Sequence, residues 1–512
     1  MQSVSVGVGP LTEAEVVAVA RGGAGVSVAD DAVAAIAAAR KVVDALAEDV
    51  EPHYGISTGF GALATKHIPV EQRALLQRSL IRSHAAGSGP EVEREVIRAM
   101  MLLRLSTLAT GHTGVRPATA AALAALLDKG ITPLVREFGS LGCSGDLAPL
   151  AHVALALIGE GTVRAPDGTE GAAADVLRAH GVEPVALAEK EGLALINGTD
   201  GMLGQLLLAC HDLDLLLRTA DISAAMSIEA LLGTAAVFAA DLQALRPQLG
   251  QAVSAANLRA LLADSPIIAS HAGPDCVYVQ DAYSMRCAPQ VAGAARDTLA
   301  HARSVAACEL ASAVDNPVVV EGRVESNGNF HGAPVAYVLD FLAIPAADVA
   351  SMSERRTDRM LDVARSRGLP PFLAADPGVD SGHMIAQYTQ AALVSEMKRL
   401  AVPASVDSIP SSAMQEDHVS MGWSAARKLR RSVDALTRVL AIELLTAARA
   451  LDMRAPLLPG PATGAVVAAL REIVPGPGPD RFLSPEIEAA VEFVRSGAAV
   501  DAADSALAHP LQ

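Results

Sequence analysis

The segment of residues 424–451 constrains the fold more than any other part of the sequence. Its apolar residues recur at alternating spacings of three and four, at Leu429, Val433, Leu436, Leu440, Leu444, Ala447 and Leu451. This spacing places them on one face of a long α-helix. The second half of the segment adds Val439, Ile442, Leu445 and Ala448 on the other faces. A helix that is apolar all round is expected at the centre of a helical bundle.

Comparable long helical patterns cover residues 204–232, 296–313, 334–361 and 383–400. Pro345 lies within one of them and is expected to kink or interrupt that helix. Aromatic residues make up only 3% of the chain, so the core must consist mainly of Ala, Leu and Val, which pack well as helix against helix. The sequence therefore predicts a mainly α protein built around a bundle of long helices.

Composition narrows the classes of partner. The formal net charge is -17, which disfavours nucleic acid and anionic lipid as partners, and the sequence shows no apolar run expected to span a bilayer. Hydrophobic residues make up 51% of the chain, and several helices are apolar nearly all round. Such surface is expected to be buried between subunits, so an obligate homo-oligomer is predicted.

Five cysteines are scattered along the chain without C-x-x-C spacing, and an odd number cannot all pair within one chain. Residues 1–10 lack the basic start and long apolar stretch of a secretory signal. Both features favour a reducing, cytoplasmic location.

Three consecutive domains are expected from the distribution of Gly and Pro. Residues 1–196 are the most broken by these residues, residues 197–455 carry the long helices, and a Pro/Gly-rich stretch at 456–479 begins a helical appendage that covers residues 456–512.

Residues 139–152, Gly-Ser-Leu-Gly-Cys-Ser-Gly-Asp-Leu-Ala-Pro-Leu-Ala-His, are the most informative stretch for function. Considered locally, Asp146 is a good N-cap for a helix that begins at Leu147, and Pro149 is tolerated in a first helical turn. A capped turn without catalytic function is the simplest interpretation of a lone Ser-Gly-Asp.

The whole segment, however, resembles the signature of the aromatic amino acid ammonia-lyases and aminomutases. The resemblance implies a fumarase/aspartase-like helical architecture in which the N-terminal domain carries the prosthetic group. That group would be 4-methylidene-imidazol-5-one, formed autocatalytically from Cys143-Ser144-Gly145. The residue types agree with this chemistry, because Gly145 has an unhindered backbone nitrogen and Ser144 has a β-hydroxyl that can leave as water.

Cys143 stands where the commoner family pattern has Ala. Only the backbone carbonyl of this residue enters the ring, so the substitution is compatible with cyclisation. The thiol is expected to add reactivity or redox sensitivity.

The resemblance extends from about Tyr54 to Pro456. Residues 54–61, Tyr-Gly-Ile-Ser-Thr-Gly-Phe-Gly, are similar to the family's tyrosine loop, which implies that Tyr54 is the base that removes the β-proton of the substrate. A phenol titrates near pH 10, so this role requires surroundings that lower its pKa. A lone Tyr would more often have a packing role.

Other stretches are similar to segments that surround the prosthetic group in the family. They imply that Asn197, Gln280 and Tyr283 hydrogen-bond the ring or the substrate amine and that Phe330 lines the pocket. Arg286 is implied to hold the α-carboxylate, a task suited to its planar fork of donors. A structural ion pair is the alternative role for Arg286.

Two features resemble the histidine-specific branch of the family, where a His and a Glu face the imidazole of the substrate. They are Ser83-His84 and the run Gln415-Glu-Asp-His-Val-Ser-Met421, which place His84, Gln415 and Glu416 at the substrate. The implied reaction is the loss of ammonia from L-histidine to give trans-urocanate. A satisfied core histidine and a helix-start cap remain the simpler roles for His84 and Glu416.

Alternatives remain open at the level of sequence. The same chemistry serves phenylalanine or tyrosine lyases and aminomutases, and a catalytically inactive assembly protein could keep the fold. No metal site is expected, because the sequence lacks H-E-x-x-H and paired cysteine spacing. The resemblance also implies a homotetramer in which each active site draws residues from three chains.

Overall fold

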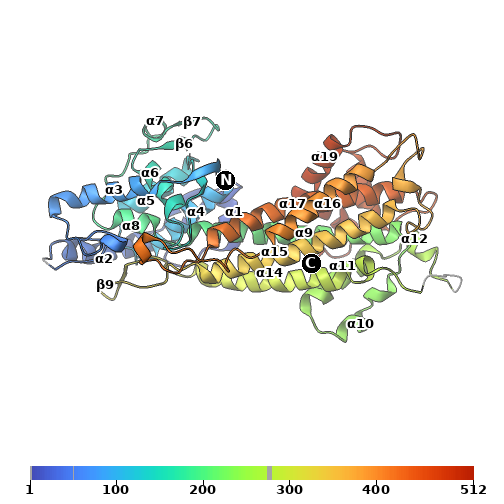
Figure 1. Ribbon diagram of the computed structural model, residues 1–512, viewed down its shortest axis with the longest axis horizontal. Coiled ribbons are helices and arrows are strands. Elements are labelled where there is room, and N and C mark those ends of the chain that lie inside the picture. The colour runs from blue at the N-terminus through green and yellow to red at the C-terminus, as the bar shows by residue number, and fades with distance from the viewer. Residues whose placement is uncertain (1–2, 50, 274–278) are drawn as a thin grey trace. The chain divides into compact units, whose positions relative to one another are not determined.

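The computed structural model describes residues 3–49, 51–273 and 279–512, and it is mainly helical (Figure 1). The chain divides into two compact units. Unit 1 consists of Met1–His211, Arg303–Asp340 and Pro403–Arg427, and unit 2 consists of Asp212–Ala302, Phe341–Val402 and Lys428–Gln512. The mainly α fold class predicted from the sequence is confirmed.

Unit 1 contains eight shorter helices among its described residues: α1 (Glu13–Ala20), α2 (Asp30–Ala47), α3 (Arg73–His84), α4 (Arg94–Ala109), α5 (Pro117–Asp128), α6 (Leu147–Leu157), α7 (Ala173–Ala179) and α8 (Glu191–Ile196). Short 3-10 helices cover Gly61–Leu63, Val70–Gln72 and Ser412–Met414.

The strands of unit 1 are short: β1 (Ser3–Val6), β2 (Gly25–Val28), β3 (Ser88–Glu91), β4 (Thr132–Pro133), β5 (Arg136–Phe138), β6 (Thr162–Arg164), β7 (Glu170–Ala172), β8 (Val318–Val320) and β9 (Arg323–Glu325). β1 pairs in parallel with β2, with Ser3 opposite Gly25. β3 pairs with β5, β6 pairs with β4 and β7, and β8 pairs with β9, all antiparallel. Among the described residues, each of these sheets has two or three short strands.

In the part of the chain that the structure describes, four long helices pass from one unit into the other along the chain: α9 (Asp200–Ala230), α14 (Ala288–Leu310), α15 (Ala333–Leu361) and α17 (Gly422–Asp452). Unit 2 adds α10 (Ala240–Ala244), α11 (Leu249–Leu261), α12 (Pro266–Ala269), α13 (Tyr283–Arg286), α16 (Met384–Leu400), α18 (Pro461–Arg471), α19 (Ser484–Arg495) and α20 (Ala498–Asp504). Its 3-10 helices cover Ala236–Phe238 and Pro371–Leu373.

The long helices lie where the apolar periodicity predicts them, within a few residues except at the start of α14. In unit 2 they pack against one another, since Gln390 of α16 donates hydrogen bonds to Ser353 of α15 and to the carbonyl oxygen of Val439 in α17. Residues 439–451 of α17 are buried on every side, as the all-round apolar pattern predicts. The bundle of unit 2 is therefore built from the apolar faces that the sequence predicts.

Pro345 does not interrupt α15, which continues from Ala333 to Leu361. Of the two outcomes expected at Pro345, a kink or an interruption, the interruption is wrong. A proline removes one backbone hydrogen bond, but burial of Leu342, Ala346 and Val349 around it holds the helix together.

Among the described residues, α15 is the one helix that is long and apolar enough to cross a membrane by length and composition. The sequence was expected to hold no such stretch. Of the most apolar window of this helix, 61% is buried inside the protein, which is typical of a core helix.

The two compact units are interleaved in sequence, whereas the domains expected at residues 1–196, 197–455 and 456–512 are consecutive. The difference arises because the long helices belong to both units along their length. The three-domain division stays a prediction.

Candidate active site in unit 1

Unit 1 contains a cavity of about 610 Å³ that brings together several of the predicted site residues. Tyr54, His84, Ser144, Asn197 and Glu416 all line it. They come from five separate stretches of the chain: the loop after α2, the end of α3, the loop before α6, the end of α8 and the segment 411–421. This convergence makes the cavity the candidate active site.

The loop of Tyr54 is anchored by Ile56, two residues further on, which packs in a buried cluster with Ala39, Val43 and Val319. The phenol oxygen of Tyr54 accepts a hydrogen bond from the backbone N–H of Gly61 at 3.3 Å, which closes the loop on itself. The ring of Tyr54 meets that of Phe60 edge to face, with centroids 6.5 Å apart. Packing of Ile56 therefore fixes the loop while Tyr54 faces the cavity.

Burial raises the pKa of Tyr54 above its ordinary value, and the nearby carboxylates of Glu416 and Asp315 raise it further. The hydrogen bond from Gly61 acts in the opposite direction but does not outweigh burial. The expectation that the surroundings lower this pKa is wrong for the isolated chain. Two carboxylates beside a buried phenol disfavour the phenolate.

The tripeptide Cys143-Ser144-Gly145 lies in a turn that only glycine permits at its last position. Gly145 has a φ of +77°, and a Cβ atom there would lie 1.9 Å from the carbonyl oxygen of Gly198. The same oxygen accepts the N–H of Asp146 at 2.7 Å. Gly142 has a φ of +69°, and its carbonyl oxygen accepts the hydroxyl of Ser420 at 3.2 Å. The backbone is thus folded tightly around Ser144.

α6 begins at Leu147, as predicted, but Asp146 at its N-cap position makes no capping hydrogen bond with its side chain. The predicted cap is therefore wrong. The Asp146 carboxyl instead accepts from the N–H of Met202 at 2.8 Å and from the hydroxyl of Ser140 at 3.0 Å. Complete burial raises the pKa of Asp146 to about 7. This carboxyl therefore ties the tripeptide turn to the start of α9.

The Cys143 thiol is free and half-buried. Burial raises its pKa to about 12, and the neighbouring carboxylate of Glu416 contributes. A thiol that resists ionisation is a poor nucleophile, so the surroundings argue against the reactivity expected from the sequence.

Asn197 ends α8 and is almost completely buried. Its side-chain N–H donates to the carbonyl oxygen of Asn316 at 2.6 Å, while its Oδ1 is buried with no hydrogen-bond partner in the described structure. A buried orphan acceptor is costly unless a ligand or prosthetic group satisfies it. The Oδ1 atom can therefore accept a hydrogen bond from a donor in the cavity that Ser144 also lines.

His84 and Glu416 are the polar side chains expected to meet the imidazole of a substrate. His84 Nδ1 lies 3.0 Å from the carbonyl oxygen of Leu80, an acceptor only, so Nδ1 carries the hydrogen. Burial lowers the pKa of His84, which keeps the ring neutral and leaves Nε2 as an acceptor. The Glu416 carboxylate is fixed by the hydroxyl of Ser411 at 2.8 Å.

Seven of the predicted residues do not line this cavity, and two of them, Cys143 and Gly145, flank Ser144 in the tripeptide. Gln415 is exposed and Phe330 is half-buried, both in unit 1 but outside the lining. Gln280, Tyr283 and Arg286 belong to unit 2. There the guanidinium carbon of Arg286 stacks over the Tyr283 ring, 4.6 Å from its centroid, and Arg286 Nε is buried without a hydrogen-bond partner in the described structure. The structural ion pair considered for Arg286 is not seen among the described residues.

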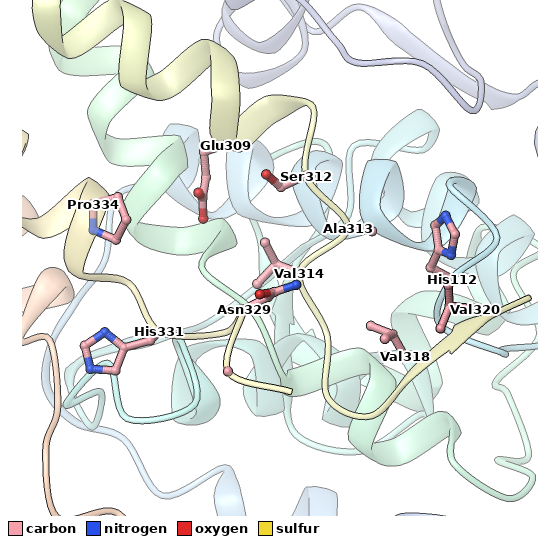
Figure 2. A pocket seen from close by; sticks show the side chains of 11 residues that line it. His112, Glu309, Ser312, Ala313, Val314, Val318, Val320, Asn329, His331 and Pro334 are labelled. Atoms are coloured by element: carbon pink, nitrogen blue, oxygen red, sulfur yellow. The ribbon is translucent and has the colours of Figure 1, made fainter. Parts of the chain in front are cut away.

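A second cavity of unit 1, of about 650 Å³, contains none of the predicted residues. Figure 2 shows Glu309 and Ser312, at the end of α14 and just after it, on one side and the loop residues Asn329 and His331 on another. Glu309 accepts the hydroxyl of Thr199, two residues after Asn197. This contact links the lining of the second cavity to the segment that follows Asn197.

Comparison with known proteins identifies the family. The family model described as aromatic amino acid lyase matches residues 11–472. The chain belongs to the aromatic amino acid lyase family. The family resemblance and the expectation of a carbon–nitrogen lyase are thereby confirmed.

Individual relatives of this family match along almost the whole chain. The histidine ammonia-lyase of Streptomyces avermitilis is 66% identical over 99% of each chain, and that of Anaeromyxobacter sp. (strain K) is 51% identical over 95% of this chain and 97% of its own length. Among solved structures, a tyrosine aminomutase from Streptomyces globisporus has 40% identity and a TM-score of 0.94 with full coverage of both chains. A histidine ammonia-lyase from Trypanosoma cruzi has 39% identity and a TM-score of 0.91, covering 99% of this chain and 96% of its own.

Sequence reasoning missed the charged groups that support Asn197 in this member of the aromatic amino acid lyase family. Arg104 is fully buried and donates to the carbonyl oxygens of Asn197 at 2.7 Å and Val314 at 2.9 Å. Lys190 and Asp315 form a fully buried ion pair at 2.7 Å. A charge inside an apolar segment gives no sequence signal of its partner, and only tertiary contacts reveal these groups.

Proposed function

We propose that the chain eliminates ammonia from L-histidine to give trans-urocanate. The observation that carries the proposal is the convergence of Tyr54, His84, Glu416 and Ser144 on one cavity. The relatives that are 51–66% identical to the chain and are named histidine ammonia-lyase support the same substrate.

We further propose that Cys143, Ser144 and Gly145 cyclise to 4-methylidene-imidazol-5-one. The Gly145 nitrogen bonds to the Cys143 carbonyl carbon, and two waters leave, one from that carbonyl oxygen and one from the Ser144 hydroxyl. The tight turn and the glycine-only position 145 fit this group, and the orphan acceptor of Asn197 fits the amine of the substrate, which can donate. When formed, it supplies an electron-poor methylene that activates the substrate for loss of ammonia. The N-terminus of α6, two residues on, favours electron demand there.

Histidine would be selected by two acceptors. The hydrogen on His84 Nδ1 is committed to Leu80, so both His84 Nε2 and the Glu416 carboxylate accept hydrogen bonds. An imidazole ring offers an N–H donor to these acceptors, whereas the phenyl ring of phenylalanine leaves both desolvated and unpaired. Tyr54 would remove the β-proton of the bound substrate, and Asn197 would hold the substrate amine.

The remaining binding groups would come from other copies of the chain in a cytoplasmic homotetramer. Arg286 would grip the substrate carboxylate with Gln280 and Tyr283 beside it, while Phe330 and Gln415 would complete the pocket wall. Large apolar side chains are exposed on α15 and α16, at Tyr337, Phe341, Ile344, Ile385 and Tyr388. Such surface supports burial between subunits.

Incubation of the purified protein with L-histidine tests the proposal. Urocanate and ammonia are expected in equal amounts. A β-amino acid product would instead indicate an aminomutase, the activity for which one of the structural neighbours is named. Absence of any product, with an intact tripeptide found by mass spectrometry, would contradict both the reaction and the prosthetic group.

A further inference from the structure

Arg356 and Glu443 form a buried ion pair inside the helical bundle of unit 2. The Arg356 side chain is 3% exposed and that of Glu443 is fully buried, and Arg356 Nε lies 2.5 Å from Glu443 Oε1. The second guanidinium contact, from Nη2 to Oε2, is 2.9 Å. Two charges removed from water in this way carry a large desolvation cost, and an apolar pair of similar volume is often equally stable or more so.

The carboxylate of Glu443 is saturated with donors. Besides the two contacts from Arg356, it accepts the hydroxyls of Ser223 at 2.8 Å and Ser227 at 2.7 Å, both on α9. Four hydrogen bonds leave this carboxylate one orientation, so the guanidinium that it grips is also fixed in place.

The third guanidinium nitrogen of Arg356, Nη1, faces the segment that carries the proposed carboxylate-binding residues. Arg356 Nη1 donates to the carbonyl oxygen of Ser284 at 3.1 Å. Ser284 lies in the four-residue helix α13, between Tyr283 and Arg286. The short helix is too small to hold its own shape, so an external anchor determines where these two side chains stand.

A second buried anchor holds the other end of the same segment. The Asp281 carboxylate accepts from the N–H of Thr234 at 2.7 Å and from Arg367 at 2.9 Å. Between and beyond these anchored residues, Tyr283 is 69% exposed, and Arg286 Nε is buried without a hydrogen-bond partner in the described structure. The segment is thus held at Asp281 and Ser284 while Arg286 keeps a buried donor unsatisfied, the arrangement of a site built before its ligand arrives.

We propose that Arg356, oriented by Glu443, is a positioning residue that holds α13 so that Arg286 meets the substrate carboxylate. The inference rests on the proposed role of Arg286 in binding histidine. Arg356 touches no substrate itself, and its effect passes through the Ser284 carbonyl. Loss of the anchor therefore impairs recognition of the carboxylate and leaves recognition of the imidazole unchanged.

The test uses the double variant Arg356→Met/Glu443→Leu in the full-length protein. Replacing both partners avoids an uncompensated buried charge, so the variant is expected to fold. Two competitive inhibitors are compared: imidazole-4-propionate, which has the carboxylate, and 4-methylimidazole, which lacks it. The matched control is Arg449→Met on the same helix as Glu443, because Arg449 is a buried arginine that donates to the carbonyl oxygens of Leu373 and Gly478.

The double variant should weaken imidazole-4-propionate by about tenfold or more, the size of one lost charge-assisted contact, and change 4-methylimidazole by less than about twofold. The Michaelis constant for histidine should rise, and the near-ultraviolet absorption of the prosthetic group should not change. Arg449→Met should alter neither inhibition constant.

Equal changes for both inhibitors, or no change for either, would overturn the positioning role. Arg286→Ala, measured in parallel, separates the two levels of inference. If Arg286→Ala weakens imidazole-4-propionate and the double variant does not, the proposed function stands and the role of Arg356 is wrong. If Arg286→Ala has no effect, the carboxylate clamp and the inference built on it both fail.

Discussion

Ser144 is the residue on which the proposed chemistry depends, because its β-hydroxyl must leave to create the methylene. Ser144→Ala has no such hydroxyl, so the variant should fold and assemble yet lose almost all turnover. Its near-ultraviolet absorption should also lack the band of the cyclised group. Circular dichroism checks that the helices remain. Turnover near that of the wild type would exclude the prosthetic group as assigned.

Tyr54 is surrounded by groups that raise its pKa: burial first, then Glu416 and Asp315. Below that pKa the phenolate fraction grows about tenfold for each pH unit, so kcat/KM for histidine should climb steadily from pH 7 into the alkaline range. Tyr54→Phe should lose about 10²–10⁴-fold in turnover and show a flatter profile, since general-base catalysis contributes that much.

The control is the absorption of the prosthetic group, which Tyr54→Phe should retain. A variant within a few-fold of the wild type would transfer the role of base to another residue, with Glu416 the first candidate.

At the scale of elements, the turn between β5 and α6 requires glycine at position 145. Gly145→Ala would bring a Cβ atom to 1.9 Å from the Gly198 carbonyl oxygen, so the turn must open and the electrophile should not form. Gly168→Ala is the matched control, because Gly168 has a similar φ of +88° but a Cβ atom there would meet no other atom within 4 Å.

The control variant should lose about 1–3 kcal/mol of stability from backbone strain and keep its activity. Thermal unfolding and absorption spectra measure both effects. An active Gly145→Ala enzyme would show that the turn has more freedom than its packing against Gly198 indicates.

The long helices were predictable because their periodicity is a local property repeated over many residues. The bounds of α17 differ from the predicted 424–451 by two residues or fewer. The sequence around Asp146 is compatible with a helix cap, so a cap was predicted there. The prediction is wrong because Ser140 and Met202 donate to this carboxyl in the folded chain. A partner such as Met202, 56 residues from Asp146, cannot be inferred from local propensity, which is also why Arg104 and the Lys190–Asp315 pair were missed.

The candidate site was predictable to the extent that the family motifs occur in the chain. Tyr54, His84, Ser144, Asn197 and Glu416 converge as the resemblance implies. The pKa of Tyr54 was not predictable, since it depends on which carboxylates fold beside it.

At the scale of the whole molecule, each site is expected to be assembled from several chains. Co-expression of Ser144→Ala and Arg286→Ala chains should then restore activity well above the sum of the two variants alone. Some sites would combine an intact tripeptide from one chain with an intact Arg286 from another. Co-expressed Ser144→Ala and Tyr54→Phe provide the control, because both residues line one cavity of the same unit and should not complement. Activity that stays at the sum in both pairs would place Arg286 in its own chain's site.

The choice of histidine over other amino acids rests on the two acceptors His84 and Glu416 in one cavity. The most direct measurement compares kcat/KM for L-histidine and L-phenylalanine on the wild type and on Glu416→Gln. The wild type should convert histidine to urocanate and disfavour phenylalanine by about 10⁴-fold, as sites built to bond a polar ligand do. Glu416→Gln should lose most histidine turnover while it keeps the absorption of the prosthetic group. Comparable wild-type efficiency on the two amino acids would contradict the selection of histidine by His84 and Glu416, even if ammonia were released from both.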